Sequence, residues 1–541
     1  MSGIASGPGE WPWSAHLDEP VDRDALVARL SSGSLGREFA ATAGSAADRP
    51  ALTIGDLTRT HGELDRRAAL LGGWLARHGV RRGDLVLIAG RTSHELVAAY
   101  LGTLRCGATA FPVDASSTAA ELGALVAAAR PAAAFCDASA SAALATLPDG
   151  RRPGLLLALD GGAEGVAVDK AIADGEPLEP AGAAAPAIVA FTSGTTGMPK
   201  GVPLSHANVL ASIRAVMMAW RWDRDEVLVH ALPLSHQHGL GGLHATLLAG
   251  SHAVLEPRFD ASAFCERAGA VAATAVMAVP TIWEGLDEWD GGARAALARL
   301  RIGISGSAPL SAALALRVRE WLGQLPLERY GSTEAGLVLS NPLRGERRPG
   351  SVGSPLPGIE VRITGGDGSD VAPGENGELV VRGPQVFGGY LNRPRETEAA
   401  FTGEGWFRSG DIARQDPADG SIAITGRSKD MIISGGLNVF PREVEAVLEE
   451  HAAVGGSAVV GAPSARWGEE VVAFVVPRAG ASPDPEELIA HCRERLSGFK
   501  CPKRVLVVDG LPTNEMGKVR REELVAAATD EGGVGGAGFR R

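Results

Sequence analysis

The alternation of apolar and polar positions predicts strands and helices in turn over the first part of the chain. Residues 63–78 carry apolar side chains at helical spacing, and the apolar run Leu85–Ala89 is typical of a buried parallel strand. The same reasoning predicts a helix over Ser93–Cys106 and a strand over Ala110–Val113. This alternation indicates an α/β fold in which helices cover parallel-rich sheets.

Two changes of pattern divide the rest of the chain. Short strands separated by Gly and Pro over residues 353–382 predict a small β-rich subdomain. After Arg427, helices are expected over 441–451 and 485–496 with short strands around them, which predicts a small α+β C-terminal domain. The expected division is a flexible lead-in over 1–30, an N-terminal domain over 31–427, a C-terminal domain over 428–525 and a disordered tail over 526–541.

Composition and charge narrow the classes of function. The 541 residues are enough for more than one domain, and 52 basic against 64 acidic residues give a net charge of −12, so nothing favours nucleic acid as a partner. Five widely spaced cysteines without a C-x-x-C pair indicate free thiols in a reducing cytoplasm. The N-terminus lacks the features of a secretory signal, and no apolar stretch reaches the ~20 residues of a membrane span.

A loop rich in glycine and hydroxyl groups follows an apolar strand that begins near residue 188. Glycines allow positive φ and close approach to a ligand, while consecutive N–H groups, hydroxyls and one lysine suit phosphate oxygens. The spacing differs from a Walker A loop, because Pro199 precedes the lysine and two glycines lie three apart. A surface turn is the alternative interpretation. The candidate phosphate-binding residues are Thr192, Ser193, Gly194, Thr195, Thr196, Gly197 and Lys200.

This loop and five later motifs resemble one known family. SGTTGMPKG resembles the signature of the adenylate-forming superfamily, which comprises acyl-CoA synthetases, adenylation domains and luciferases. The resemblance covers about residues 35–525 and is closest to malonyl-CoA synthetase-like enzymes. The later motifs follow in the family's order: GISGSAPL (303–310), ERYGSTE (328–334), WFRSGDIA (406–413), GRSKDMIISGG (426–436) and PTNEMGKVRR (512–521).

The resemblance implies an AMP-forming acid–CoA ligase that uses ATP and Mg²⁺. The enzyme would convert a carboxylic acid into an acyl-adenylate and pyrophosphate, and CoA would then take the acyl group as a thioester and release AMP. A carboxylic acid and CoA are therefore the expected partners. An enzyme that passes the acyl group to a carrier protein or another nucleophile is the alternative, and a catalytically inactive nucleotide-binding protein is a third interpretation.

The resemblance also implies a nucleotide site. Tyr330 would lie against the adenine, and Asp411 would accept hydrogen bonds from the two ribose hydroxyls. Arg427 would reach the ribose or a phosphate. Glu334 would bind Mg²⁺, with Thr195 as a weaker second ligand. The implied nucleotide set is completed by Gly306, Ser307, Ala308, Pro309, Glu328, Arg329, Gly331, Ser332 and Thr333.

The resemblance also implies three catalytic residues, a hinge residue and two glycines that admit CoA. Lys518 would touch the carboxylate and the α-phosphate together and stabilise the charge of the transition state. His236 and Thr333 are further catalytic candidates. Lys429 occupies the position of the family's hinge, about which the small domain would rotate between the two half-reactions. The thin pantetheine arm of CoA would pass Gly435 and Gly436.

The residues of the expected acyl pocket do not identify which carboxylic acid is the substrate. Malonate-activating relatives commonly carry Phe where this chain has Ser235 and Met where it has Ser332, and they use an arginine for the second carboxylate. Dicarboxylic, aryl and short or medium acyl acids all remain candidates. Amino acids are disfavoured, because the FDAS segment at 259–262 lies some twenty residues beyond the position of the amino-group motif. Expected pocket residues are His236, His238, Gly306 and Ser332, and arginines considered for a second carboxylate are Arg258, Arg317 and Arg319, with Leu316 at one aligned position.

Overall fold

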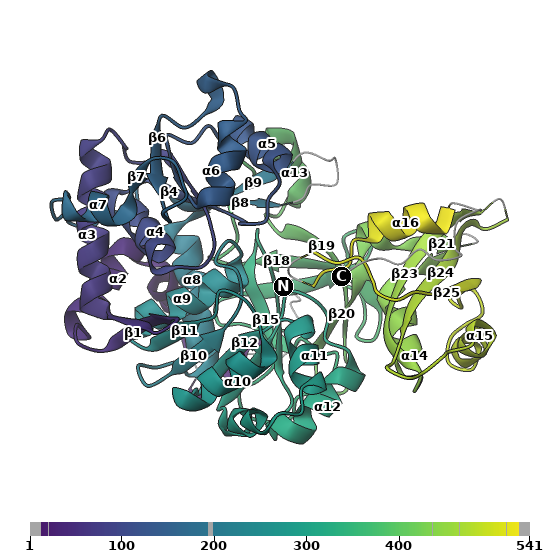
Figure 1. Cartoon of the computed structure of the whole chain (residues 1–541). Helices are drawn as coiled ribbons and strands as arrows, with labels where there is room; N and C mark the ends of the chain where they lie inside the picture. The colour runs from purple at the N-terminus through teal and green to yellow at the C-terminus, as the bar shows by residue number, and fades with distance from the viewer. Residues whose placement is uncertain are drawn as a thin grey trace.

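The structure is a computed structural model that describes residues 12–19, 21–192, 199–434, 437–464, 466–514 and 517–529 (Figure 1). Its largest sheet has nine strands, and six consecutive strands at its centre run parallel. The strand order is β16 (Ser354–Pro355), β15 (Gly336–Ser340), β14 (Leu327–Ser332), β13 (Ile302–Ser305), β12 (Ala275–Ala278), β10 (Val227–His230), β11 (His252–Leu255), β1 (Pro50–Ile54) and β2 (Leu57–Thr60).

A second, seven-stranded sheet carries the glycine-rich loop. Its last two strands form an antiparallel hairpin in which Thr192 pairs with Lys200, so the loop leaves the sheet between these two residues. The strand order is β7 (Val166–Ala167), β6 (Leu155–Ala158), β5 (Ala133–Cys136), β3 (Leu85–Ala89), β4 (Thr109–Val113), β8 (Pro186–Thr192) and β9 (Lys200–Ser205).

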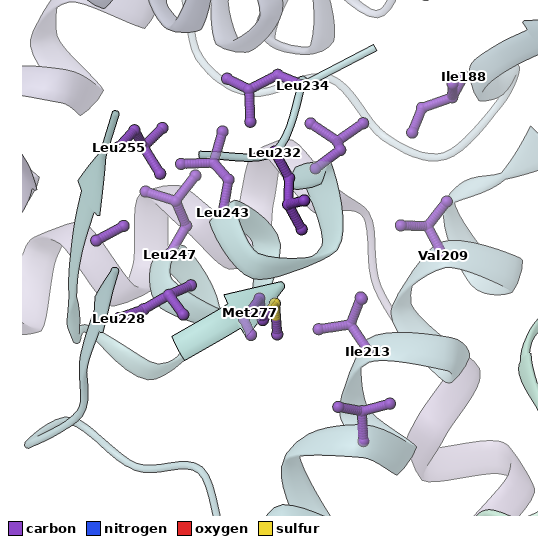
Figure 2. Close-up of a cluster of buried hydrophobic side chains, with 14 of the residues drawn as sticks. Ile188, Val209, Ile213, Leu228, Leu232, Leu234, Leu243, Leu247, Leu255 and Met277 are labelled. Carbon is purple, nitrogen blue, oxygen red and sulfur yellow. The ribbon is translucent and has the colours of Figure 1, made fainter. Parts of the chain in front are cut away.

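Helices pack between and around the two sheets. The predicted helices and strands of the first part of the chain are confirmed, and α3 begins at a capping box in which Thr60 and Glu63 bond each other's backbone N–H. Figure 2 shows leucines of α9 beside strand residues such as Leu228 and Met277, which belong to one core. These helices are α2 (Leu35–Ser45), α3 (His61–Arg77), α4 (His94–Cys106), α5 (Ala119–Ala129), α6 (Ala138–Ala145), α7 (Val168–Ala173), α8 (His206–Trp220), α9 (Gln237–Ala249), α10 (Ala261–Ala270), α11 (Pro280–Glu288) and α12 (Ala312–Leu322).

A four-stranded antiparallel sheet leads to the small C-terminal part of the molecule. Its strands are β17 (Glu360–Thr364), β18 (Asn376–Arg382), β19 (Phe407–Gln415) and β20 (Ile422–Arg427), with α13 (Pro394–Ala400) before β19. The small part follows, has hydrophobic clusters of its own, and lies beside β19 and β20 in Figure 1. Its elements are η4 (Ser428–Asp430), β21 (Ile432–Ser434), β22 (Leu437–Val439), α14 (Pro441–Glu449), β23 (Val454–Ser464), β24 (Gly468–Pro477), α15 (Pro485–Arg493), β25 (Arg504–Val507) and α16 (Arg521–Thr529).

The two ends of the chain differ from the sequence-based expectation. Within the expected flexible lead-in, α1 (Arg23–Ser31) packs on α8 and buries Leu26 and Leu30. At the other end, α16 runs past the expected boundary at residue 525 and buries Ala528. Both helices are too short for a strong periodic signal, and contacts with the rest of the fold stabilise them. No helix among the described residues is long and apolar enough to span a membrane.

Candidate active site

Tyr330 and Asp411 form the nucleotide side of the site. The Tyr330 hydroxyl donates to Oδ2 of Asp411 at 2.5 Å, and Nε of Arg427 lies 2.9 Å from the other carboxylate oxygen. Asp411 and Arg427 are paired neighbours on β19 and β20, which fixes this ion pair through the sheet. Burial, and then Asp411, raise the pKa of Tyr330, so the phenol stays protonated and keeps the carboxylate oriented.

Lys518 approaches the same carboxylate from the small part of the molecule. Its loop is closed by a hydrogen bond from the Lys518 N–H to Oδ1 of Asn514 at 2.9 Å, and Gly517 turns with φ of +69°. The loop touches α11, because a Cβ on Gly517 would lie 2.8 Å from Cγ2 of Thr281. Burial, and then Arg427, lower the pKa of Lys518 to about 8, while Asp411 acts in the opposite direction. The structure therefore brings the predicted catalytic lysine to the predicted ribose carboxylate.

A third cluster lies where β9 begins. The Tyr390 hydroxyl donates to Oε1 of Glu334 at 3.1 Å, and Nζ of Lys200 lies 5.0 Å from the centroid of the Tyr390 ring. Sequence reasoning missed Tyr390, which no recognised motif contains. Magnesium bound to a nucleotide needs only one or two protein carboxylates besides the phosphates, so Glu334 fits as its protein ligand. Among the described residues, no group of three or more His, Cys, Asp or Glu side chains could hold a metal ion.

Several predicted residues lie outside the described ranges, and their roles stay predictions. They include most of the glycine-rich loop and the two glycines assigned to the pantetheine arm. Lys429, the predicted hinge residue, is described and lies in η4, close enough to lower the pKa of Lys518. The residues outside the described ranges are Ser193, Gly194, Thr195, Thr196, Gly197, Gly435 and Gly436.

Arg329 occupies the face of β14 opposite to Tyr330. Successive side chains of a strand point to opposite faces, so Tyr330 reaches Asp411 and Arg329 points to the other side. The Arg329 side chain lies over Gly306, where an added Cβ would be 2.4 Å from Nε of the guanidinium. Gly306 is expected both in the nucleotide set and in the acyl pocket, so the contact of Arg329 with the nucleotide stays a prediction.

The Arg329 guanidinium is buried without a counter-ion. The residue is 8% exposed, and no hydrogen bond or ion pair joins its side chain to any residue that the structure describes. Burial lowers its pKa to about 10, so at neutral pH it still carries its charge. An uncompensated buried charge is strongly unfavourable, and the arrangement therefore suits an anion brought by a ligand.

Neutral polar groups surround this guanidinium. Nδ1 of His238 lies 3.1 Å from Oγ of Ser307, while Nε2 of His238 and Oγ of Ser305 have no partner among the described residues. Burial, and then Arg329 and His230, hold the pKa of His238 well below its usual value. Ser307 has φ of +70°, a strained conformation for a residue with a side chain. Together these groups are suited to hydrogen-bond an anionic ligand.

His236 stands at the entrance of α9. Its side chain is 43% exposed, and Nε2 lies 3.4 Å from Oδ2 of Asp114, which also accepts a hydrogen bond from Ser235 at 3.3 Å. Asp114 was not predicted, because it comes from a distant strand end. Thr333 contributes its carbonyl, which accepts from the Gln237 amide at 2.9 Å.

Ser332 and the arginines considered for a second carboxylate differ in their hydrogen bonds and exposure. The Ser332 hydroxyl accepts the Ala335 N–H at 3.1 Å and so caps its own turn. Of the arginines considered for a second carboxylate, Arg317 is already paired with Asp287 at 2.7 Å, and the other two are exposed. Leu316 is 39% exposed. Among these arginines and Arg329, only Arg329 is both buried and free of a partner among the described residues.

Comparison with protein families gives a match to the AMP-binding enzyme family over residues 39–391 and to the AMP-binding enzyme C-terminal domain over residues 443–518. The chain belongs to the AMP-binding enzyme family. Both regions carry site residues, since the first contains Tyr330 and the second ends at Lys518.

Similar proteins within this family are acid–CoA ligases. The chain is 39% identical to a mitochondrial malonate–CoA ligase, ACSF3, of Bos taurus, over 63% of this chain and 64% of that protein. It therefore spans slightly less than two thirds of that relative. It is 37% identical to a feruloyl-CoA synthase of Amycolatopsis sp. over 88% of this chain and 95% of the relative. The ATP-bound crystal structure of MatB from Rhodopseudomonas palustris superposes with a TM-score of 0.85 at 34% identity, covering 92% and 99% of the two chains.

Proposed function

We propose that this AMP-binding family member is an ATP-dependent acid–CoA ligase that activates a short dicarboxylic acid. The named relatives support the ligase reaction, because they are CoA ligases for different acids. The observation that carries the choice of acid is the buried guanidinium of Arg329, whose Nε has no hydrogen-bond partner among the described residues. One carboxylate of the acid reacts with ATP, and the other compensates Arg329.

The first half-reaction uses groups of both parts of the molecule. The reacting carboxylate attacks the α-phosphate, and Lys518 holds the two anions together in its protonated form. Asp411, oriented by Tyr330 and Arg427, holds the ribose. Mg²⁺, when bound by Glu334 and the phosphates, neutralises charge on the departing pyrophosphate. His236 lies beside Asp114 at the entrance and helps to position the reacting carboxylate.

The distal carboxylate is selected by charge. Arg329 lies near His238, whose Nδ1 is 3.1 Å from Oγ of Ser307, and a monocarboxylic or aryl acid would bring no second anion to these groups. A ligand carboxylate at this position would form an ion pair with the buried charge of Arg329. Removal of one partner from a buried ion pair costs about 3–5 kcal/mol. A feruloyl group would bring an uncharged hydroxymethoxyphenyl ring to the same place. These contacts support a dicarboxylic acid over the aryl alternative.

The acceptor is CoA. Trp467, 36% exposed, lies beside the hairpin of β21 and β22, and the cations of Arg466 and Lys503 lie 4.7 and 5.7 Å from its ring centroid. An aromatic surface with two cations suits the base and phosphates of the CoA nucleotide. An enzyme that uses a carrier protein as its acceptor would not need a surface that binds a nucleotide. We keep a reducing cytoplasm as the proposed location, since all five cysteines are free thiols.

The test measures pyrophosphate and thioester together, with ATP, Mg²⁺ and a panel of malonate, succinate, propionate and ferulate, each with and without CoA. We expect CoA-dependent thioester from the dicarboxylic acids. In Lys518→Ala we expect the rate of pyrophosphate release to fall by about 10²–10³-fold, while thioester formation from supplied acyl-adenylate is retained. Pyrophosphate without thioester would point to another acceptor, and loss of both half-reactions would contradict the role of Lys518.

A further inference from the structure

A short segment between β18 and α13 joins two charged residues of the phosphate side of the site. The N–H of Phe387 donates to the carbonyl oxygen of Glu334, the predicted metal ligand, at 2.8 Å. Four residues later, the N–H of Leu391 donates to the carbonyl oxygen of Gly201 at 2.8 Å, and Gly201 directly follows Lys200. The segment therefore bonds the backbone beside both groups that are expected to meet the metal and the triphosphate.

Tyr390 is the only residue of the segment 387–391 with a polar side chain, and its position is fixed by the fold. Its N–H donates to Oγ1 of Thr397 on α13 at 2.9 Å. Gly389 has φ of +139°, and a Cβ there would lie 2.5 Å from Cγ2 of Thr397, so this turn requires glycine. The ring of Phe387 packs edge-on against the Tyr390 ring, with centroids 4.9 Å apart. These contacts hold the phenol in place without a ligand.

The Tyr390 hydroxyl orients the carboxylate of Glu334. It donates to Oε1 at 3.1 Å, and no other described residue bonds the carboxylate. A phenol with an ordinary pKa of about 10 is uncharged at neutral pH, so this hydrogen bond fixes the carboxylate without compensating its charge. Carboxylates that bind a metal ion are commonly held by such a hydrogen bond from a neighbouring residue, and loss of that neighbour weakens metal binding.

The face of the same ring receives the ammonium of Lys200. Nζ lies 5.0 Å from the ring centroid, within the ~6 Å of a cation–π contact. Among the described residues, Lys200 forms no ion pair. A direct pair of Lys200 with Glu334 would compensate both charges before ATP and its metal ion bind. Tyr390 instead gives each of the two charges a neutral partner.

We propose that Tyr390 is a positioning residue for ATP and its metal ion. Its hydroxyl holds Glu334 in the orientation that binds Mg²⁺, and its ring keeps Lys200 apart from that carboxylate and available to a phosphate. The inference rests on the proposed function, in which Glu334 binds Mg²⁺. A cation–π contact is weak, so a phosphate can take the lysine from the ring without breaking an ion pair.

The test measures ATP binding by calorimetry without any acid, once with saturating Mg²⁺ and once with EDTA. Tyr390→Phe removes the hydroxyl and keeps the ring. We expect the Kd of ATP with Mg²⁺ to rise about tenfold in this variant, while the Kd in EDTA stays within about twofold. Tyr390→Leu removes the ring as well and lets Lys200 pair with Glu334, so the Kd in EDTA should also rise, by about threefold.

Two further variants separate positioning from a general loss of structure. Glu334→Gln should lose the effect of Mg²⁺ on ATP binding, and adding Tyr390→Phe should weaken binding no further, because the hydroxyl acts through this carboxylate. Tyr100→Phe is the matched control, since it removes a buried hydroxyl that lies 2.7 Å from Nε2 of His244. Both Kd values should stay unchanged in this control, and thermal unfolding shows that each variant is folded.

An unchanged Kd with Mg²⁺ in Tyr390→Phe, or an equal rise of both Kd values, would overturn this role of Tyr390. A further loss when Tyr390→Phe is added to Glu334→Gln would do the same. If Mg²⁺ fails to tighten ATP binding even in the unmodified protein, the metal role of Glu334 and this inference are both contradicted. Binding as expected, without thioester from any acid, would leave the role of Tyr390 intact and contradict the proposed function instead.

Discussion

Arg329 and Arg347 both carry a guanidinium into the large part of the molecule, and burial lowers the pKa of each to about 10. Neither has an ion pair with a carboxylate among the described residues. They differ in hydrogen bonding. Arg347 donates to three carbonyl oxygens and one side-chain amide, whereas Nε of Arg329 has no partner there. The acceptors of Arg347 are Pro342 O at 3.0 Å, Leu325 O at 2.6 Å, Leu343 O at 3.0 Å and Gln324 Oε1 at 3.2 Å.

This difference separates a structural arginine from a binding one. Arg347 joins the end of β15 to the segment before β14, and its donors are satisfied by the fold itself. Arg329 is more deeply buried than Arg347, and its Nε lacks such a partner among the described residues, so a ligand anion would relieve an unfavourable buried charge. The following predictions test this contrast, from the largest expected effect on activity to the smallest.

Replacing Arg329 with Met removes the charge and keeps much of the volume. We expect kcat/KM for a dicarboxylic acid to fall by about 10²–10³-fold, equivalent to about 3–4 kcal/mol, while Tm stays the same or rises. The measurement is steady-state pyrophosphate release together with thermal unfolding. A loss of Tm without loss of selectivity would mean that Arg329 is structural, as Arg347 is.

Gly306→Ala tests the space that Arg329 requires. The new Cβ would meet the guanidinium at 2.4 Å and force it to move, so kcat/KM for the dicarboxylic acid should fall about tenfold or more. Gly44→Ala is the control, because a Cβ there meets nothing within 4 Å. Equal activity of the two variants would show that the position of Arg329 is unimportant.

The first half-reaction should depend on pH through Lys518. The charged form of Lys518 is the active one, and its pKa lies at about 8. The rate of adenylation should therefore decline as pH rises above 8, and this decline should approach tenfold per pH unit. Arg427, Asp411, Lys429 and Asp430 face this lysine. A flat profile from pH 7 to 9.5 would contradict this role of Lys518.

Arg347→Met completes the comparison with the smallest expected effect on activity. The four acceptors would lose their donors, and we expect the free energy of unfolding to fall by about 2–4 kcal/mol with kcat/KM within twofold of the unmodified protein. Chemical denaturation and the pyrophosphate assay measure the two quantities. A selective loss for dicarboxylic acids in this variant would remove the distinction between the two arginines.

Local sequence predicted the parts of this molecule that local interactions determine. The strand Leu85–Ala89 and the helix over residues 63–78 follow from short patterns. The opposite directions of Arg329 and Tyr330 also follow from the sequence, because successive side chains of a strand point to opposite faces.

Other features depend on contacts between residues far apart in the chain. Asp114 meets His236 across more than a hundred residues, and Tyr390 meets Glu334 from a segment without a motif. No pattern within one segment contains such information, because tertiary packing brings the partners together.

The most direct test of the account is a competition in one vessel. Equal concentrations of malonate and propionate, with ATP, Mg²⁺ and CoA, give thioesters whose initial ratio equals the ratio of the two kcat/KM values. The account predicts that malonyl-CoA exceeds propionyl-CoA by at least about 100-fold in the unmodified protein and that Arg329→Met removes most of this excess. Equal amounts of the two thioesters, or an excess of propionyl-CoA in the unmodified protein, would contradict it.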